Sequence, residues 1–147
     1  MSVGWRDGRL VTDVSSGRVS GHARGAFTTV GCDRGQPLLW EQHQRRLAGS
    51  LENLGGGLST RLPSMGALVE LLSANGLSGP ARVRVVGRLD SGAGWQIEAS
   101  AVAVHDAGPA APPQSLAVHQ WPAAAPSAGH KLLARQPWDS ARDKAMA

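Results

Sequence analysis

Residues 25–47 read GAFTTVGCDRGQPLLWEQHQRRL, and this segment decides the fold. The part GAFTTVGC predicts a strand, residues 33–35 (Asp-Arg-Gly) predict a turn, and QPLLW predicts the returning strand of a hairpin. From Trp40 onward the apolar side chains recur at helical spacing. The segment therefore predicts a β-hairpin that leads directly into an amphipathic helix.

Two helices are expected. The first carries one stripe of side chains at helical spacing, formed by Trp40, His43, Leu47, Leu51 and Leu54. Gly55 is placed to cap its end, because glycine adopts the left-handed conformation found after many helices. Residues 64–75 (SMGALVELLSAN) predict a second, shorter amphipathic helix that Gly76 stops.

Further strands surround these helices in the sequence. A hairpin is expected at the N-terminus, where Asp7-Gly8 is a strong two-residue turn signal. In ARVRVVG, valines alternate with arginines, and WQIEASAVAV continues the strand pattern after the turn LDSGAG. These strands are expected at residues 3–6, 9–11, 81–87, 95–104 and 114–121. The order ββ–ββ–α–α–ββ–β predicts an α+β fold, an antiparallel sheet with two helices on one face.

The composition restricts the class of protein. The 147 residues, 41% of them hydrophobic, suit one domain with a real core. No apolar run approaches the roughly 20 residues that span a bilayer. The charged N-terminus does not resemble a signal peptide, and the single Cys32 cannot form an internal disulfide, so a cytoplasmic location is expected. The net charge of +4 comes from scattered arginines and few aromatics accompany them, so we expect no nucleic-acid partner.

Few side chains carry chemistry by themselves. The five histidines show no metal-ligand spacing, and His43 on the apolar stripe is interpreted as a core or boundary histidine. Cys32 is interpreted as a small strand residue. Three arginines on one strand face predict either a solvated face or a cationic wall for a carboxylated substrate; they are Arg82, Arg84 and Arg88. Arg46 lies in H-x-x-R-L on the first helix, and Lys131 is one of only two lysines.

Taken together, the motifs resemble a known family. The Asp-Gly hairpin is followed by GAFTTV (25–30), by WEQHQRRL (40–47) and, about 85 residues later, by KLLAR (131–135). This order is similar to the N-terminal half of the fold-type IV pyridoxal-phosphate enzymes, the class IV aminotransferase family. Within it, Thr28-Thr29 and an arginine four residues after the lysine most resemble 4-amino-4-deoxychorismate lyase.

The resemblance implies roles for individual residues. Lys131 would form the Schiff base with pyridoxal 5'-phosphate, and Arg46 would bind the cofactor phosphate, with its guanidinium directed into a pocket near Lys131 while Arg45 faces solvent. The substrate-binding residues would be Thr28, Thr29, Arg135 and His22. No metal is implied. The partners would be a small carboxylated substrate and a second copy in a homodimer.

The implied activity is conversion of 4-amino-4-deoxychorismate to 4-aminobenzoate and pyruvate, a step in folate synthesis. A branched-chain or D-amino-acid aminotransferase of the same fold is the alternative. Non-catalytic alternatives are a truncated binding or assembly module and a basic RNA-associated domain.

Two departures from the family pattern affect these expectations. HARGAF replaces the usual aromatic-Gly-acid-Gly approach, so that His22 and Ala23 occupy its first positions. The family's second domain would lie beyond Ala147, so the sequence predicts a truncated chain that is inactive alone. We expect an N-terminal α+β domain over residues 1–113, and residues 114–147 as an interdomain segment that carries the lysine and begins the second domain.

Overall fold

The computed structural model describes residues 2–12, 24–57, 61–90, 92 and 94–104. The element order is β1, β2, β3, β4, α1, α2, β5, β6. The strands are β1 (Val3–Arg6), β2 (Arg9–Thr12), β3 (Gly25–Asp33), β4 (Gln36–Pro37), β5 (Ala81–Asp90) and β6 (Gly94–Ala103). They form one antiparallel sheet in the order β2-β1-β6-β5-β3-β4. The expected α+β fold is therefore confirmed.

Two tight turns close the hairpins. Asp7 and Gly8 both have positive φ, 44° and 103°, as the two-residue turn between twisted strands requires. Arg34 and Gly35 do the same with φ of 49° and 71°, so Asp33 pairs with the residue directly after the turn. The second turn thus has two central residues, where the sequence suggested three.

The helices begin and end at the expected signals. α1 (Trp40–Asn53) ends in a glycine cap: Gly55 has φ 83° and its N–H donates to the carbonyl of Glu52. α2 (Met65–Ala74) begins at Ser64, whose hydroxyl accepts from the Ala67 N–H at 3.1 Å, and Gly76 stops it in the same way with φ 66°. Local capping chemistry therefore sets both ends of α2 and the C-terminal end of α1, whereas α1 begins after Leu39 without a side-chain cap.

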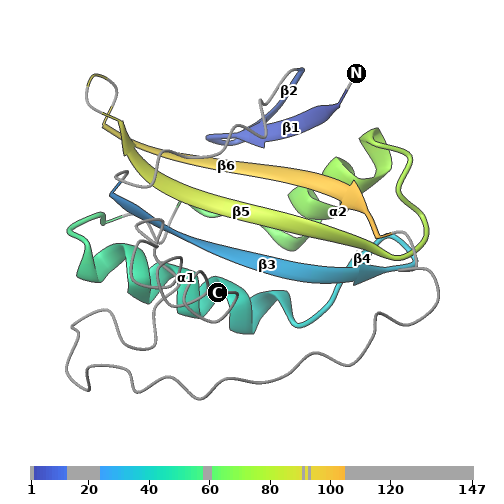
Figure 1. Cartoon of the computed structure of the whole chain (residues 1–147), viewed down its shortest axis with the longest axis horizontal. Helices are drawn as coiled ribbons and strands as arrows, with labels where there is room; N and C mark the ends of the chain where they lie inside the picture. Colours follow the sequence, from blue (N-terminus) through green and yellow to red (C-terminus); the bar gives the residue numbers. More distant parts are fainter. Residues whose placement is uncertain (1, 13–23, 58–60, 91, 93, 105–147) are drawn as a thin grey trace, which may run out of the picture.

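The core lies between the helices and one face of the sheet. α1 packs along β3, and α2 crosses the strands at one end, where it contacts β1, β4 and β6 (Figure 1). Alternate strand residues point toward the helices, as Val83 and Val85 do with no exposed surface. Leu47 and Leu51 of α1 are buried against them. Burial of these apolar side chains is the main source of stability.

Three boundaries differ from the sequence expectation. The returning strand of the second hairpin, expected over residues 36–40, has only two residues, because Leu39 adopts a left-handed conformation (φ 54°) and Trp40 begins α1. β5 extends to Asp90, so the turn before β6 is shorter than LDSGAG. The strand expected at 114–121 and the domain boundary at 113 lie outside the described residues.

Candidate functional site

Three polar side chains from β3 and α1 meet where the helix packs on the sheet. Thr28 points toward α1 and is completely buried. Its Oγ1 lies 2.8 Å from Nδ1 of His43 and accepts a hydrogen bond from Nη2 of Arg46 at 3.2 Å. Nη2 of Arg46 also lies 3.2 Å from Nδ1 of His43. We call Thr28, His43 and Arg46 the triad.

Helix geometry selects these residues. His43 and Arg46 are three positions apart and therefore share one face of α1. Arg45 is turned by about 100° from Arg46, is exposed, and makes no hydrogen bond to any described residue. Trp40 and Leu47 fix the helix, since both are buried in the core. Both arginines are exposed, and they differ in that only Arg46 contacts Thr28 and His43 among the described residues; its expected position in a pocket near Lys131 stays a prediction.

Arg46 is held in place through one of its terminal nitrogens. The two hydrogens of Nη2 are directed to Oγ1 of Thr28 and Nδ1 of His43, whereas no described residue accepts a hydrogen bond from Nε or Nη1. Within the described ranges no carboxylate lies within ion-pair distance of it. A positioned guanidinium with three N–H groups that no described residue accepts from is suited to bind a phosphate or carboxylate group.

The two threonines of the sequence motif point to opposite faces. Thr29 pairs with Arg84 on the face away from the helices, whereas Thr28 pairs with Val85 on the helix face. On the outer face Cζ of Arg84 lies 4.3 Å from the centre of the Phe27 ring, a cation–π contact. Thr28 and Thr29 therefore cannot contact one ligand from the same face.

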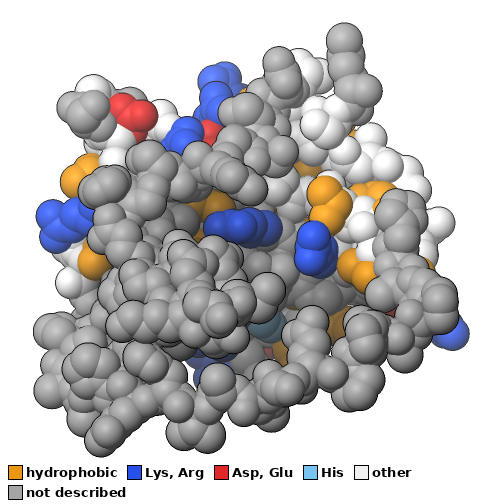
Figure 2. Space-filling view, in the orientation of Figure 1, with side chains coloured by type: hydrophobic (Ala, Val, Ile, Leu, Met, Phe, Trp, Pro, Cys, Tyr) orange, Lys and Arg blue, Asp and Glu red, His pale blue; other side chains and the backbone are white. Residues whose placement is uncertain are grey.

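The other two strand arginines of the outer face differ in their contacts: Arg88 forms an ion pair, whereas Arg82 is exposed. Arg88 donates to Oε1 of Glu98 at 3.3 Å, and Arg6 contacts the same oxygen at 2.7 Å. Arg82 is exposed. The basic side chains form separate patches in Figure 2, with no continuous basic surface over the described part of that view. Only Arg84, of the three strand arginines, lies beside Phe27.

The structure does not test the remaining site residues. His22, Lys131 and Arg135 lie outside the described residues, so the expected approach of Arg46 to Lys131 stays a prediction. Among the described residues no group of three or more His, Cys, Asp or Glu side chains could hold a metal ion. No helix in the described ranges is long and apolar enough to cross a membrane.

Cys32 fits the structural interpretation. Its side chain is buried, and burial raises the pKa of the thiol, although a backbone hydrogen bond from Val83 acts in the opposite direction. A thiol whose pKa is raised is a poor nucleophile at neutral pH.

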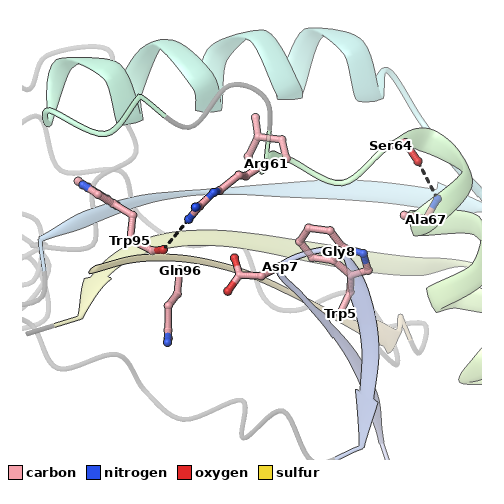
Figure 3. Close-up of a pocket in the computed structure, with 9 residues that line it drawn as sticks. Trp5, Asp7, Gly8, Arg61, Ser64, Ala67, Trp95 and Gln96 are labelled. Atoms are coloured by element: carbon pink, nitrogen blue, oxygen red, sulfur yellow. Dashed lines mark hydrogen bonds between the residues drawn. The ribbon is translucent and has the colours of Figure 1, made fainter. Parts of the chain in front are cut away.

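A separate cavity of about 650 Å³ lies elsewhere on the helix side of the sheet (Figure 3). Trp5 and Asp7 of the first hairpin line it, together with Arg61, which reaches the carbonyl oxygen of Trp95 at 3.4 Å. None of the predicted site residues that the structure describes lines this cavity. It is therefore distinct from the triad.

The sequence interpretation of His43 as a core or boundary histidine is confirmed, but its contacts with Thr28 and Arg46 were not anticipated. The histidine is half-buried and bonded to both other members of the triad. Its spacing of three residues from Arg46 was the available signal, but the partner on β3 is 15 residues away and could not be paired with it from sequence.

Comparison with known proteins supplies the context for this geometry. The family model for amino-transferase class IV matches residues 25–147. No curated protein sequence matches the chain. Among solved structures, the chain is similar to the T.th. branched-chain amino acid aminotransferase complexed with N-(5'-phosphopyridoxyl)-L-glutamate, with a TM-score of 0.54 and 13% identity over 70% of this chain and 40% of that one.

Two further solved structures are similar to the chain in fold. A hypothetical aminotransferase from Mycobacterium tuberculosis in its PLP-bound form gives a TM-score of 0.53 at 16% identity, covering 71% of this chain and 40% of that chain. The M4 mutant of the branched-chain amino acid aminotransferase from Thermobaculum terrenum gives 0.51 at 15% identity, covering 71% and 39%. The chain thus spans about two fifths of the length of these structures, and at such identities the likeness shows the fold. Because the family model matches most of its residues, the chain belongs to the class IV aminotransferase family.

Proposed function

We propose that the protein uses pyridoxal 5'-phosphate and that Arg46 binds the phosphate of this cofactor. The observation that carries the proposal is the triad, which holds Nη2 of Arg46, while no described residue accepts from its Nε or Nη1. These donors fit a phosphate in charge and in hydrogen-bonding capacity. Two similar structures are described as complexes with pyridoxal-phosphate compounds, which supports the same cofactor here.

Lys131 completes the proposed site through its amine. When bound, the cofactor supplies an electron sink for carbanion chemistry. Lys131 would hold the cofactor covalently and then move a proton at the substrate carbons, which requires a lysine whose pKa is lowered by its surroundings. The neighbouring Leu132 and Leu133 can anchor this segment in a core.

For the reaction, we favour the lyase that releases pyruvate from 4-amino-4-deoxychorismate. This substrate carries two carboxylates, which need cationic or hydroxyl partners. Arg135 would supply a cationic partner, whereas Thr29 and Arg84 are paired on the face of the sheet opposite Thr28 and Arg46 and are not assigned to this site. Thr28 would act indirectly, because its hydroxyl already contacts His43 and Arg46.

Transamination is the second candidate, since the T.th. and Thermobaculum terrenum structures are branched-chain amino acid aminotransferases. A branched-chain substrate would need an apolar pocket instead of cationic partners. For either reaction, we propose that the protein is a homodimer and is located in the cytoplasm.

One assay separates the two reactions. The full-length gene product with pyridoxal 5'-phosphate is given 4-amino-4-deoxychorismate, and pyruvate is measured with a coupled dehydrogenase. In parallel it is given leucine and 2-oxoglutarate, and glutamate is measured. We expect pyruvate and no glutamate. Glutamate without pyruvate would assign the protein to the aminotransferases, and neither product would contradict both.

A further inference from the structure

The hydrogen bonds of the triad specify the protonation of His43. Arginine donates and cannot accept, so the contact between Nη2 of Arg46 and Nδ1 of His43 requires an unprotonated Nδ1. This contact, read as a hydrogen bond, fits a neutral His43 with its proton on Nε2 and with Nδ1 shared between Arg46 and Thr28.

The same reasoning orients the hydroxyl of Thr28. Its oxygen accepts from Arg46, so its hydrogen is directed to Nδ1 of His43, at the shorter distance of 2.8 Å. Each member of the triad thus contacts the other two. Removal of the acceptor at Nδ1 would leave the buried Thr28 hydroxyl without this partner and release one Nη2 hydrogen of Arg46.

We propose that His43, as the Nε2–H tautomer, is a positioning residue that orients Arg46 toward the cofactor phosphate. The inference rests on the proposed function, since it assumes that the anion bound by Arg46 is this phosphate. An arginine side chain has several rotatable bonds, and fixing them before a ligand arrives reduces the entropy cost of binding. Thr28 and His43 supply that fixation from a rigid strand and a rigid helix.

Two substitutions at residue 43 test the role of the acceptor. His43→Asn retains an oxygen acceptor close to the position of Nδ1, whereas His43→Leu keeps bulk and removes it. The measured quantity is the ratio of the Kd for pyridoxal to the Kd for pyridoxal phosphate, which isolates the phosphate contribution. We expect His43→Leu to lower this ratio about tenfold or more, as loss of a hydrogen bond to a charged group does, and His43→Asn to restore most of it.

Matched variants separate this inference from the proposed function. Arg46→Ala should abolish the phosphate preference, and the adjacent, exposed Arg45→Ala should leave it unchanged. If Arg46→Ala has no effect, the proposed function fails. If Arg46→Ala has its effect but His43→Leu does not, or if both His43 variants are equally impaired, the positioning role fails while the phosphate site stands.

Two further measurements keep the test decisive. Long-range ¹H–¹⁵N spectra, with the His43 signals assigned by their loss in His43→Asn, should show a protonated Nε2 and an unprotonated Nδ1 at neutral pH; a protonated Nδ1 would overturn the proposal. If His43→Leu does not fold, Thr28→Val against Thr28→Ser removes or keeps the hydroxyl at nearly constant shape. The Val variant should lower the Kd ratio and the Ser variant should retain it, and equal ratios would overturn the proposal.

Discussion

Nη2 of Arg46 donates to Oγ1 of Thr28 across 3.2 Å, which joins an exposed cation of α1 to a fully buried hydroxyl of β3. Arg45 has the same charge and lies on the same helix without such a contact among the described residues. The two neighbouring arginines are therefore chemically identical and structurally different.

From this difference we predict opposite results for two alanine variants in direct cofactor titration. Arg46→Ala should weaken pyridoxal phosphate binding by about 10- to 100-fold, because a hydrogen-bonded charge pair is lost. Arg45→Ala should change the affinity by less than about twofold, as expected for a solvated charge. Thermal unfolding of both variants is the control for folding, and a larger loss from Arg45→Ala would reverse the assignment.

Lys131 should be the residue that reacts with the cofactor. After the full-length protein is mixed with pyridoxal phosphate and reduced with borohydride, peptide mapping should find the label on the peptide that contains Lys131. Lys131→Ala should abolish labelling, since no other amine would be held at the cofactor aldehyde. Label on Lys144, the other lysine of the sequence, would contradict the assignment.

Gly87 is required by the packing of α1 on the sheet. A Cβ at this position would lie 2.6 Å from Cδ2 of Leu51 and 3.0 Å from Cδ1 of Ile97, and both of these side chains are fully buried. We expect Gly87→Ala to lower the free energy of unfolding by about 1–3 kcal/mol, the usual cost of overpacking a core. Urea denaturation measures it.

Gly49→Ala is the matched control. It lies within α1, and a Cβ there would meet nothing within 4 Å. Alanine should therefore raise the free energy of unfolding by up to about 1 kcal/mol through helix propensity. Equal effects of the two substitutions would refute the packing argument.

Asn75 connects the end of α2 to the first strand. Its Oδ1 accepts from the Val3 N–H at 3.0 Å, and its Nδ2 donates to the carbonyls of Val3 and Leu71, both at 2.8 Å. Asn75→Ala should lower the free energy of unfolding by about 1–3 kcal/mol, because it leaves part-buried backbone groups unpaired. Asn75→Asp retains the acceptor for Val3 but loses both donors, so its free energy of unfolding should lie between those of the parent and Asn75→Ala. An unchanged free energy of unfolding in Asn75→Ala would show that water replaces these bonds.

Cys32 should make stability depend on pH in the alkaline range. Burial raises the pKa of its thiol, so the unfolded chain loses this proton at about its ordinary value of 9.0 while the folded chain retains it. The contribution of the protonated Cys32 thiol to the free energy of unfolding is therefore fully present below that pH and is lost as the pH rises toward the folded-state pKa. Denaturation midpoints between pH 7 and 10 should fall more steeply for the parent than for Cys32→Ala, and parallel curves would contradict this.

Local signals in the sequence determined the individual elements. Asp7-Gly8 specified the first hairpin because few residue pairs tolerate two successive positive φ angles. Ser64, Gly55 and Gly76 specified helix ends because capping involves only nearby backbone groups. Alternating valines and arginines in β5 specified which side of that strand is buried. Each of these interactions is short-range, so the residues that decide it are visible in one segment.

Only the tertiary structure decided which elements are neighbours and which side chains meet. β1 pairs with β6, more than 90 residues later, and periodicity identifies a buried face without naming its partner. The two adjacent threonines looked equivalent in sequence, yet the pleat directs Thr29 outward to Arg84 and Thr28 inward to the triad. His43 looked like a boundary residue for the same reason: its polar partner lies on a strand, and helix packing against that strand is what brings Thr28, His43 and Arg46 within hydrogen-bonding distance.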